Sequence, residues 1–181
     1  MESNPLITPS NLFGKIAGDH AQSVTLERHE HLKVSGSTDT NIYFVREGSM
    51  RIYVLDDCEE RIIRFAYTDD IVVSLDSFLT EKPSEFYIQA LKKTKVDVIS
   101  KKHFLEYINN SEANLRLWAN MLEGLVVQQI EREKDLLTNS PKERYLRVLE
   151  RSPQLFQQIP AKHIANYLRM TPETFSRLKK S

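Results

Sequence analysis

The sequence is poor in cysteine, in glycine and in long apolar runs. Cys58 is the only cysteine among 181 residues, which excludes a disulfide within one chain and an iron–sulfur cluster held by cysteines of one chain. Its polar surroundings predict an inert thiol in a turn. The apolar runs are only a few residues long, and the first thirty residues carry charges without a hydrophobic segment. We therefore expect neither a membrane span nor a signal peptide, and we expect a cytoplasmic protein.

The sequence also lacks net charge, but its charge is unevenly distributed. Twenty-five Lys and Arg residues balance 25 Asp and Glu residues. Residues 141–181 nevertheless hold nine basic and three acidic side chains, a net charge of +6, so residues 1–140 carry −6. Such asymmetry is expected where one small segment binds a polyanion and the remainder does not.

Between about residues 24 and 98 the apolar residues recur as they do in strands. Turn sequences rich in Gly, Ser and Asp separate the apolar runs, and Glu47-Gly48-Ser49 is one of them. Seven or eight closely spaced strands predict an antiparallel β-barrel or jelly roll. We assign residues 1–109 to this N-terminal barrel domain, which makes the predicted fold class α+β.

After Asn110 the apolar period changes to about three and a half residues. Some 26 residues without proline follow, which predicts a helix of about 40 Å. A small barrel cannot cover such a helix, so we expect its surplus apolar face to pair with the same helix of a second subunit; packing wholly on its own domain is the alternative. Residues 110–139 form this dimerisation helix and hinge. The residues expected at the dimer interface are Leu115, Trp118, Leu122, Leu125, Val126 and Ile130.

Residues 140–181 predict a helical domain that contains a helix-turn-helix. Ser140 is a predicted N-cap for a helix from 141 to 151, with Pro141 at its first position. Further on, Ile164 and Leu168 have the spacing of one buried helix face. Phe175 and Leu178 continue the pattern on a second helix, although a helical hairpin used only for packing has the same spacing.

The second of these helices carries polar and basic side chains off its apolar stripe. Thr171 is a predicted N-cap. Arg169 occupies the turn position that is often a left-handed glycine, at a cost of about 1 kcal/mol. Such a helix suits the major groove of duplex DNA, where arginine and hydroxyl groups read bases and lysines bind phosphates. The predicted DNA-binding residues are Thr171, Pro172, Glu173, Thr174, Ser176, Arg177, Lys179 and Lys180.

The order of barrel, long helix and helix-turn-helix resembles the Crp/Fnr superfamily of bacterial transcription regulators over nearly the whole chain. NIYFVREGSMRIYV (41–54) is similar to that family's strand–glycine–strand segment, and TPETFSRLKK (171–180) is similar to its recognition helix. Glu173 and Arg177 fall at base-contacting positions, whereas Pro172 stands where many members have another arginine. Only SPQLFQQ separates the flanking helices, so we expect the family's winged hairpin to be lost. This compact form is similar to members from Bacteroidetes.

The resemblance implies DNA, a second copy of the chain and RNA polymerase as partners, and it also indicates where an effector would bind. Cyclic-nucleotide binders of the family hold the ribose and phosphate with Gly-Glu and Arg-Ser pairs. Here residues 49–123 contain no glycine and residues 65–115 contain no arginine. We therefore expect no response to cAMP, and an unknown effector or none. The corresponding degenerate pocket consists of Val73, Ser74, Ser84, Glu85 and Gln129.

Two other classes of function remain open. His29-Glu30-His31 would place two imidazoles on one face of a strand, as in metal-binding barrels, but the rest of such a motif is missing. Walker A, GxSxG and HExxH patterns are also absent from the sequence. We therefore expect no enzyme, no metal site and no cofactor. The other alternative is a ligand-sensing or interaction module whose C-terminal helices no longer bind DNA.

Overall fold

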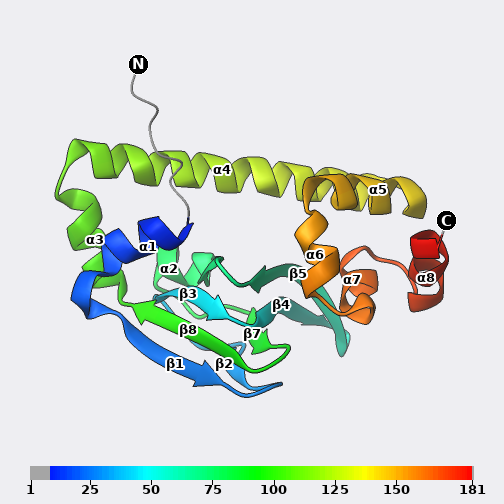
Figure 1. Ribbon diagram of the computed structural model, residues 1–181, viewed down its shortest axis with the longest axis horizontal. Helices are drawn as coiled ribbons and strands as arrows, with labels where there is room; N and C mark the ends of the chain where they lie inside the picture. The colour runs from blue at the N-terminus through cyan, green and yellow to red at the C-terminus, as the bar shows by residue number, and fades with distance from the viewer. Residues whose placement is uncertain (1–8, 181) are drawn as a thin grey trace.

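The structure is a computed structural model that describes residues 9–180, except for the side chain of Asp19. In this part of the chain eight strands form two four-stranded sheets, and all the strand pairs are antiparallel (Figure 1). The spatial order of the first sheet is β1 (Gln22–Leu26), β8 (Thr94–Ile99), β3 (Ile42–Glu47) and β6 (Ile71–Val73). That of the second sheet is β2 (His31–Lys33), β7 (Tyr87–Ala90), β4 (Ser49–Asp56) and β5 (Glu59–Tyr67).

The interior of the barrel is filled by the inward-facing residues of both sheets. Val45, Met50, Ile88 and Val96 are among its fully buried members. Because side chains alternate along a strand, the residues between them point out of the barrel. The sharp turn from β3 to β4 depends on Gly48, whose φ is 110° and whose added Cβ would lie 2.4 Å from Thr94 Oγ1. Only glycine fits there.

Short helices cover the first sheet. They are α1 (Pro9–Ala17), the 3₁₀ helix η1 (Gly18–His20), α2 (Leu75–Thr80) and α3 (Lys101–Asn109). Phe13, Phe44, Phe78 and Phe104 belong to the apolar cluster that joins α1, α2 and α3 to the sheet. Trp118 of the long helix packs on the same cluster, which fixes that helix against the barrel.

The long helix α4 (Glu112–Leu137) extends along one side of the molecule (Figure 1). It begins at the predicted position, because the Ser111 side chain caps it by accepting a hydrogen bond from the Asn114 N–H at 3.2 Å. Its 26 residues match the predicted length. In residues 9–180 no helix is both long and apolar enough to cross a membrane.

Four further helices follow α4. They are α5 (Pro141–Arg151), α6 (Pro153–Gln158), α7 (Ala161–Tyr167) and α8 (Pro172–Lys180). Ser140 caps α5 as predicted, with its hydroxyl oxygen 3.3 Å from the Glu143 nitrogen. The segment SPQLFQQ contains α6, and no strand follows β8 as far as residue 180. The predicted α+β order of barrel, long helix and helical C-terminal part is therefore confirmed.

The C-terminal helices pack on the outer face of the second sheet. One buried apolar cluster contains Tyr53, Ile62 and Phe65 from the strands together with residues of α5 to α8. The chain turns between α4 and α5 where the domain boundary was predicted, and the division into three domains stays a prediction. The barrel and the C-terminal helices nevertheless share a core, which the sequence pattern did not indicate.

Candidate nucleic-acid interface and effector site

The helices α7 and α8 form a helix-turn-helix around the residues whose spacing predicted it. Ile164, Ala165, Leu168 and Phe175 are almost completely buried, and Met170 and Leu178 pack against them. The small Ala165 lets the two helices approach closely. The apolar stripe of α8 therefore faces inward, and its other side faces solvent.

The turn between α7 and α8 is a Schellman motif with a left-handed arginine. Arg169 has a φ of 54°, as its place in the turn predicted. The N–H of Met170 donates to the carbonyl oxygen of Ala165 at 3.0 Å, and that of Arg169 donates to the carbonyl oxygen of Asn166 at 3.0 Å. These two hydrogen bonds satisfy carbonyl groups at the end of α7, which offsets part of the cost of an arginine in a conformation that favours glycine.

Two arginines from outside the motif hold the same turn. Arg132 of α4 donates to the carbonyl oxygen of Tyr167 at 2.7 Å, and its guanidinium carbon lies 3.6 Å from the centre of the Tyr167 ring. Arg144 of α5 donates to the carbonyl oxygens of Arg169 at 3.2 Å and of Thr138 at 2.7 Å. Burial lowers the pKa of Arg132. Because a helix is partially negative at its C-terminal end, both cations stabilise the end of α7.

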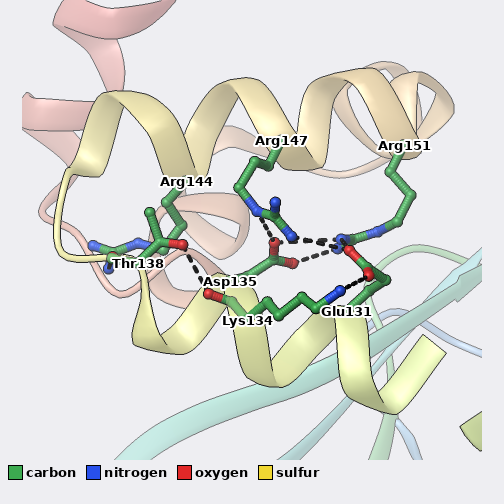
Figure 2. A network of polar contacts seen from close by, with 7 residues as sticks. All are labelled: Glu131, Lys134, Asp135, Thr138, Arg144, Arg147 and Arg151. Atoms are coloured by element: carbon green, nitrogen blue, oxygen red, sulfur yellow. Dashed lines mark hydrogen bonds and ion pairs between the residues drawn. The ribbon is translucent and has the colours of Figure 1, made fainter. Parts of the chain in front are cut away.

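The contact between α4 and α5 is an ion-pair network (Figure 2). At its centre lies Asp135, whose side chain is 0% exposed and pairs with Arg147 and Arg151. The Arg147 Nε lies 3.2 Å from Asp135 Oδ1, and its Nη2 lies 2.9 Å from Glu131 Oε2. The hydrogen bond from Lys134 lowers the pKa of Glu131, and the charge of Arg147 acts in the same direction. These contacts fold α5 back along α4.

The network lowers the number of basic side chains in residues 141–181 that are free to bind a polyanion. Of the nine basic residues there, Arg147 and Arg151 pair with carboxylates of α4, and Arg144 binds backbone carbonyl groups. The predicted net charge of +6 thus overstates the charge that can face a polyanion. The six remaining cations are Lys142, Lys162, Arg169, Arg177, Lys179 and Lys180, and all are exposed.

The predicted DNA-binding residues lie together on the outer side and at the ends of α8. Seven of the eight are exposed and Thr174 is half-buried. Thr171 caps the helix, with its hydroxyl oxygen 3.2 Å from the Thr174 nitrogen. A backbone hydrogen bond and one from the Thr171 hydroxyl lower the pKa of Glu173, which keeps this carboxylate charged at the positive end of α8.

The predicted effector residues do not all come together. Ser74 and Ser84 are buried and both donate hydrogen bonds to the Asp76 carboxylate, whereas Glu85 and Gln129 are exposed. The Ser74 hydroxyl donates to Asp76 Oδ1 at 3.0 Å. Burial alone would raise the pKa of Asp76, but hydrogen bonds from the Ser84 hydroxyl, the Ser77 N–H and the Ser74 hydroxyl hold it below its usual value. Asp76 therefore accepts hydrogen bonds from the donor groups at the start of α2.

A buried lysine lies next to this carboxylate site. The Lys33 ammonium donates to the carbonyl oxygens of Phe86 at 3.0 Å, Val34 at 3.2 Å and Ser84 at 3.3 Å. Burial lowers its pKa, while the charges of Asp76 and Asp39 oppose that shift. The predicted effector site thus already contains one positive charge, on Lys33, and one negative charge, on Asp76.

Five of the six residues predicted at a dimer interface are exposed or half-buried on α4, and the sixth, Trp118, packs inside the same chain. Leu115, Val126 and Ile130 are 46%, 59% and 46% exposed, respectively, and Leu122 and Leu125 are half-buried. Trp118 differs from them, because its ring packs on Phe78 and Phe104 of the same chain, with ring centres 6.1 and 5.1 Å apart. The exposed apolar face of α4 is therefore centred on Val126, away from Trp118.

Comparison with known proteins agrees with this architecture. Residues 23–111, just under half of the chain, match the family described as cyclic nucleotide-binding domain. Among solved structures, FixK2 from Bradyrhizobium japonicum is 19% identical, with a TM-score of 0.73 over 88% of this chain and 83% of that one. A CooA mutant from Carboxydothermus hydrogenoformans is 14% identical, with a TM-score of 0.72 over 99% and 84%. The chain has the fold of the Crp/Fnr regulators.

A third Crp/Fnr structure matches over a similar extent. The c-di-GMP-responsive regulator CLP from Xanthomonas campestris is 15% identical, with a TM-score of 0.67 over 92% of this chain and 88% of that one. No curated protein matches the sequence significantly. FixK2, the CooA mutant and CLP each match over at least 88% of this chain.

The histidine pair considered for a metal site lies elsewhere on this Crp/Fnr fold. His31 Nε2 is 3.0 Å from the Tyr53 hydroxyl, and its ring packs near Tyr87, while His29 lies in the turn before β2 with a φ of 71°. Among residues 9–180, no group of three or more His, Cys, Asp or Glu side chains is arranged to hold a metal ion.

Sequence patterns missed several residues that shape these sites. Asp76 was detectable as an acid in the first turn of a helix, two residues after the serine at its N-cap position. Lys33, Arg132 and Asp135 gave no comparable signal, because their importance comes from partners that are distant in the sequence or on another helix.

Proposed function

We propose that the protein is a homodimeric, sequence-specific DNA-binding transcription regulator of the Crp/Fnr type. The observation that carries the proposal is the exposed polar and basic side of α8, held by a helix-turn-helix whose apolar side is buried. A major groove accepts one such helix, with Thr171, Glu173 and Arg177 toward the bases. A twofold pair of these helices would bind a near-palindromic site with half-sites about 34 Å apart.

The direct test is selection of bound duplexes from a random-sequence library, followed by titration at several salt concentrations. We expect an enriched near-palindromic sequence, and an affinity that falls as salt rises because phosphate contacts release counterions. A preference for single-stranded nucleic acid, or enrichment of no sequence, would contradict sequence-specific regulation.

Two substitutions on α8 separate base reading from phosphate binding. Arg177→Ala is expected to reduce discrimination by about 1–3 kcal/mol at one base pair, because a guanidinium reads a base edge through paired hydrogen bonds. Lys179→Ala is expected to weaken all duplexes alike and to reduce the salt slope by about one. Titrations of the selected duplex and of its single-base variants measure both effects. Lys102→Ala, at an exposed lysine on α3, is the control, and identical behaviour of the two α8 variants would show that the roles are misassigned.

We also propose that the regulator does not respond to cAMP. The Asp76 carboxylate engages both buried serines, and a nucleotide phosphate placed there would meet this negative charge. Calorimetric titration with cAMP is expected to show no saturable binding. Saturable binding at micromolar concentration would show that the degenerate pocket has been misread.

The remaining expectations extend the same proposal. RNA polymerase as a further partner and the compact Bacteroidetes type follow from the resemblance to Crp/Fnr regulators, and we also propose a cytoplasmic location. The alternative function, an interaction module that has lost DNA binding, is favoured by the segment that replaces the wing and by the packing of α7 on the barrel. The duplex selection distinguishes the two, because an interaction module would enrich no sequence.

A further inference from the structure

The edge strand β5 is bound by a side chain from the helix-turn-helix. Asn166 of α7 donates through Nδ2 to the carbonyl oxygen of Glu60 at 2.8 Å. Its Oδ1 accepts from the backbone N–H of Ile62 at 2.9 Å. An edge strand has peptide groups that no neighbouring strand satisfies. One amide side chain therefore takes the place of the next strand at Glu60 and Ile62.

Apolar contacts surround these two hydrogen bonds. Ile62, Ile164 and Leu168 are almost completely buried in the cluster shared by the barrel and the C-terminal helices. Phe65 of β5 also packs on Tyr167 of α7, with ring centres 5.4 Å apart. A buried N–H or carbonyl group that loses its partner is costly, so the contact defines one arrangement of α7 on the strand.

The position of α8 follows from that of α7. The Schellman turn at Arg169 joins the two helices, and Arg132 and Arg144 hold the same turn from α4 and α5. The helix-turn-helix is thus fixed from two sides, by arginines on one and by Asn166 on the other. Asn166 contacts only the barrel through its amide, yet it limits the rotation of α7 and α8 relative to α4.

We infer that Asn166 is a positioning residue for DNA binding, which sets the separation of the two α8 helices in a dimer by fixing α7 to the edge of β5. This inference rests on the proposed function. In this inference, the protein prefers one distance between half-sites because of Asn166, a residue that does not itself contact DNA. A flexible link between barrel and helix-turn-helix would instead tolerate several spacings.

The test compares Asn166→Ala with the wild-type protein in two measurements. The first is amide hydrogen exchange at Ile62, followed by NMR. The second is affinity for a set of duplexes that carry the selected half-sites at separations differing by one base pair. Asn109→Ala, at an exposed asparagine on α3, is the matched control. Circular dichroism verifies that each variant is folded.

Asn166→Ala is expected to accelerate exchange at Ile62, and to reduce discrimination between spacings, each by about ten- to thirtyfold, the effect expected from two lost hydrogen bonds. Asn166→Asp keeps the acceptor for Ile62 but places a carboxylate against the Glu60 carbonyl, so it should also lose discrimination. It serves as the second variant if Asn166→Ala does not fold. The Asn109 control should match the wild type in both measurements.

Two different results would overturn the inference, and they show whether the positioning role or the proposed function is wrong. If the wild type binds duplex DNA with a preferred spacing and a folded Asn166 variant keeps that preference in full, the positioning role fails alone. If the wild type binds no duplex DNA, the proposed function fails and this inference fails with it.

Discussion

Asp135→Ala is expected to lower the free energy of unfolding by about 3 kcal/mol. The substitution removes a carboxylate whose side chain is 0% exposed, and it leaves Arg147 and Arg151 facing each other with only the partly exposed Glu131 to pair with both. Removal of one partner from a buried ion pair typically costs about 3–5 kcal/mol. We expect the low end of that range, because the Arg147 and Arg151 side chains are 38% and 30% exposed and can regain water.

Urea titration followed by circular dichroism measures this effect. Glu133→Ala, which removes an exposed carboxylate from the same helix, should change stability by less than about 0.5 kcal/mol. Asp135→Asn has nearly the shape of the native side chain and tests the charge alone. If Asp135→Ala and Glu133→Ala unfold at the same urea concentration, the network between α4 and α5 does not stabilise the protein.

Val126→Glu is expected to convert the proposed dimer to a monomer and to reduce affinity for the selected duplex by about a hundredfold or more. Val126 is 59% exposed at the centre of the apolar face of α4. In a twofold pairing of this helix, two glutamates would be buried close together, which costs both their hydration and their mutual repulsion. A monomer then binds each half-site separately and loses the gain from linked binding.

Light scattering gives the mass in solution, and duplex titration gives the affinity. Asn120→Glu introduces the same side chain at an exposed position of α4 that lies on a different face of the helix, and it should leave both mass and affinity unchanged. A wild-type protein that is monomeric at all concentrations would contradict the dimer, and the exposed Leu115, Val126 and Ile130 would then lack an explanation.

Local signals made most of the fold predictable. The N-caps Ser111 and Ser140 each act on a nitrogen three residues later, so a short stretch of sequence defines the start of α4 and of α5. The spacing of Ile164, Leu168 and Phe175 specified the buried side of the helix-turn-helix in the same way. Even the left-handed conformation of residue 169 followed from its place in the turn.

Contacts between distant segments were not predictable. Asn166 reads as an ordinary polar residue on a helix, and its partners Glu60 and Ile62 lie 106 and 104 positions earlier. The charge available for DNA binding was also not predictable. A count of charged residues along the chain cannot distinguish an exposed cation from one that pairs with a buried carboxylate such as Asp135. The absence of the Gly-Glu and Arg-Ser pairs is visible in the sequence, but the hydrogen bonds from Ser74 and Ser84 to the Asp76 carboxylate could be seen only in the fold.

The measurement that tests the account most directly is binding of the purified wild-type protein to duplex DNA at low ionic strength, with folding and mass verified in the same sample. The account predicts a dimer that binds duplexes through α8 and prefers a near-palindromic sequence. A folded dimer that binds no duplex of any sequence, even where electrostatic attraction is least screened, would contradict it.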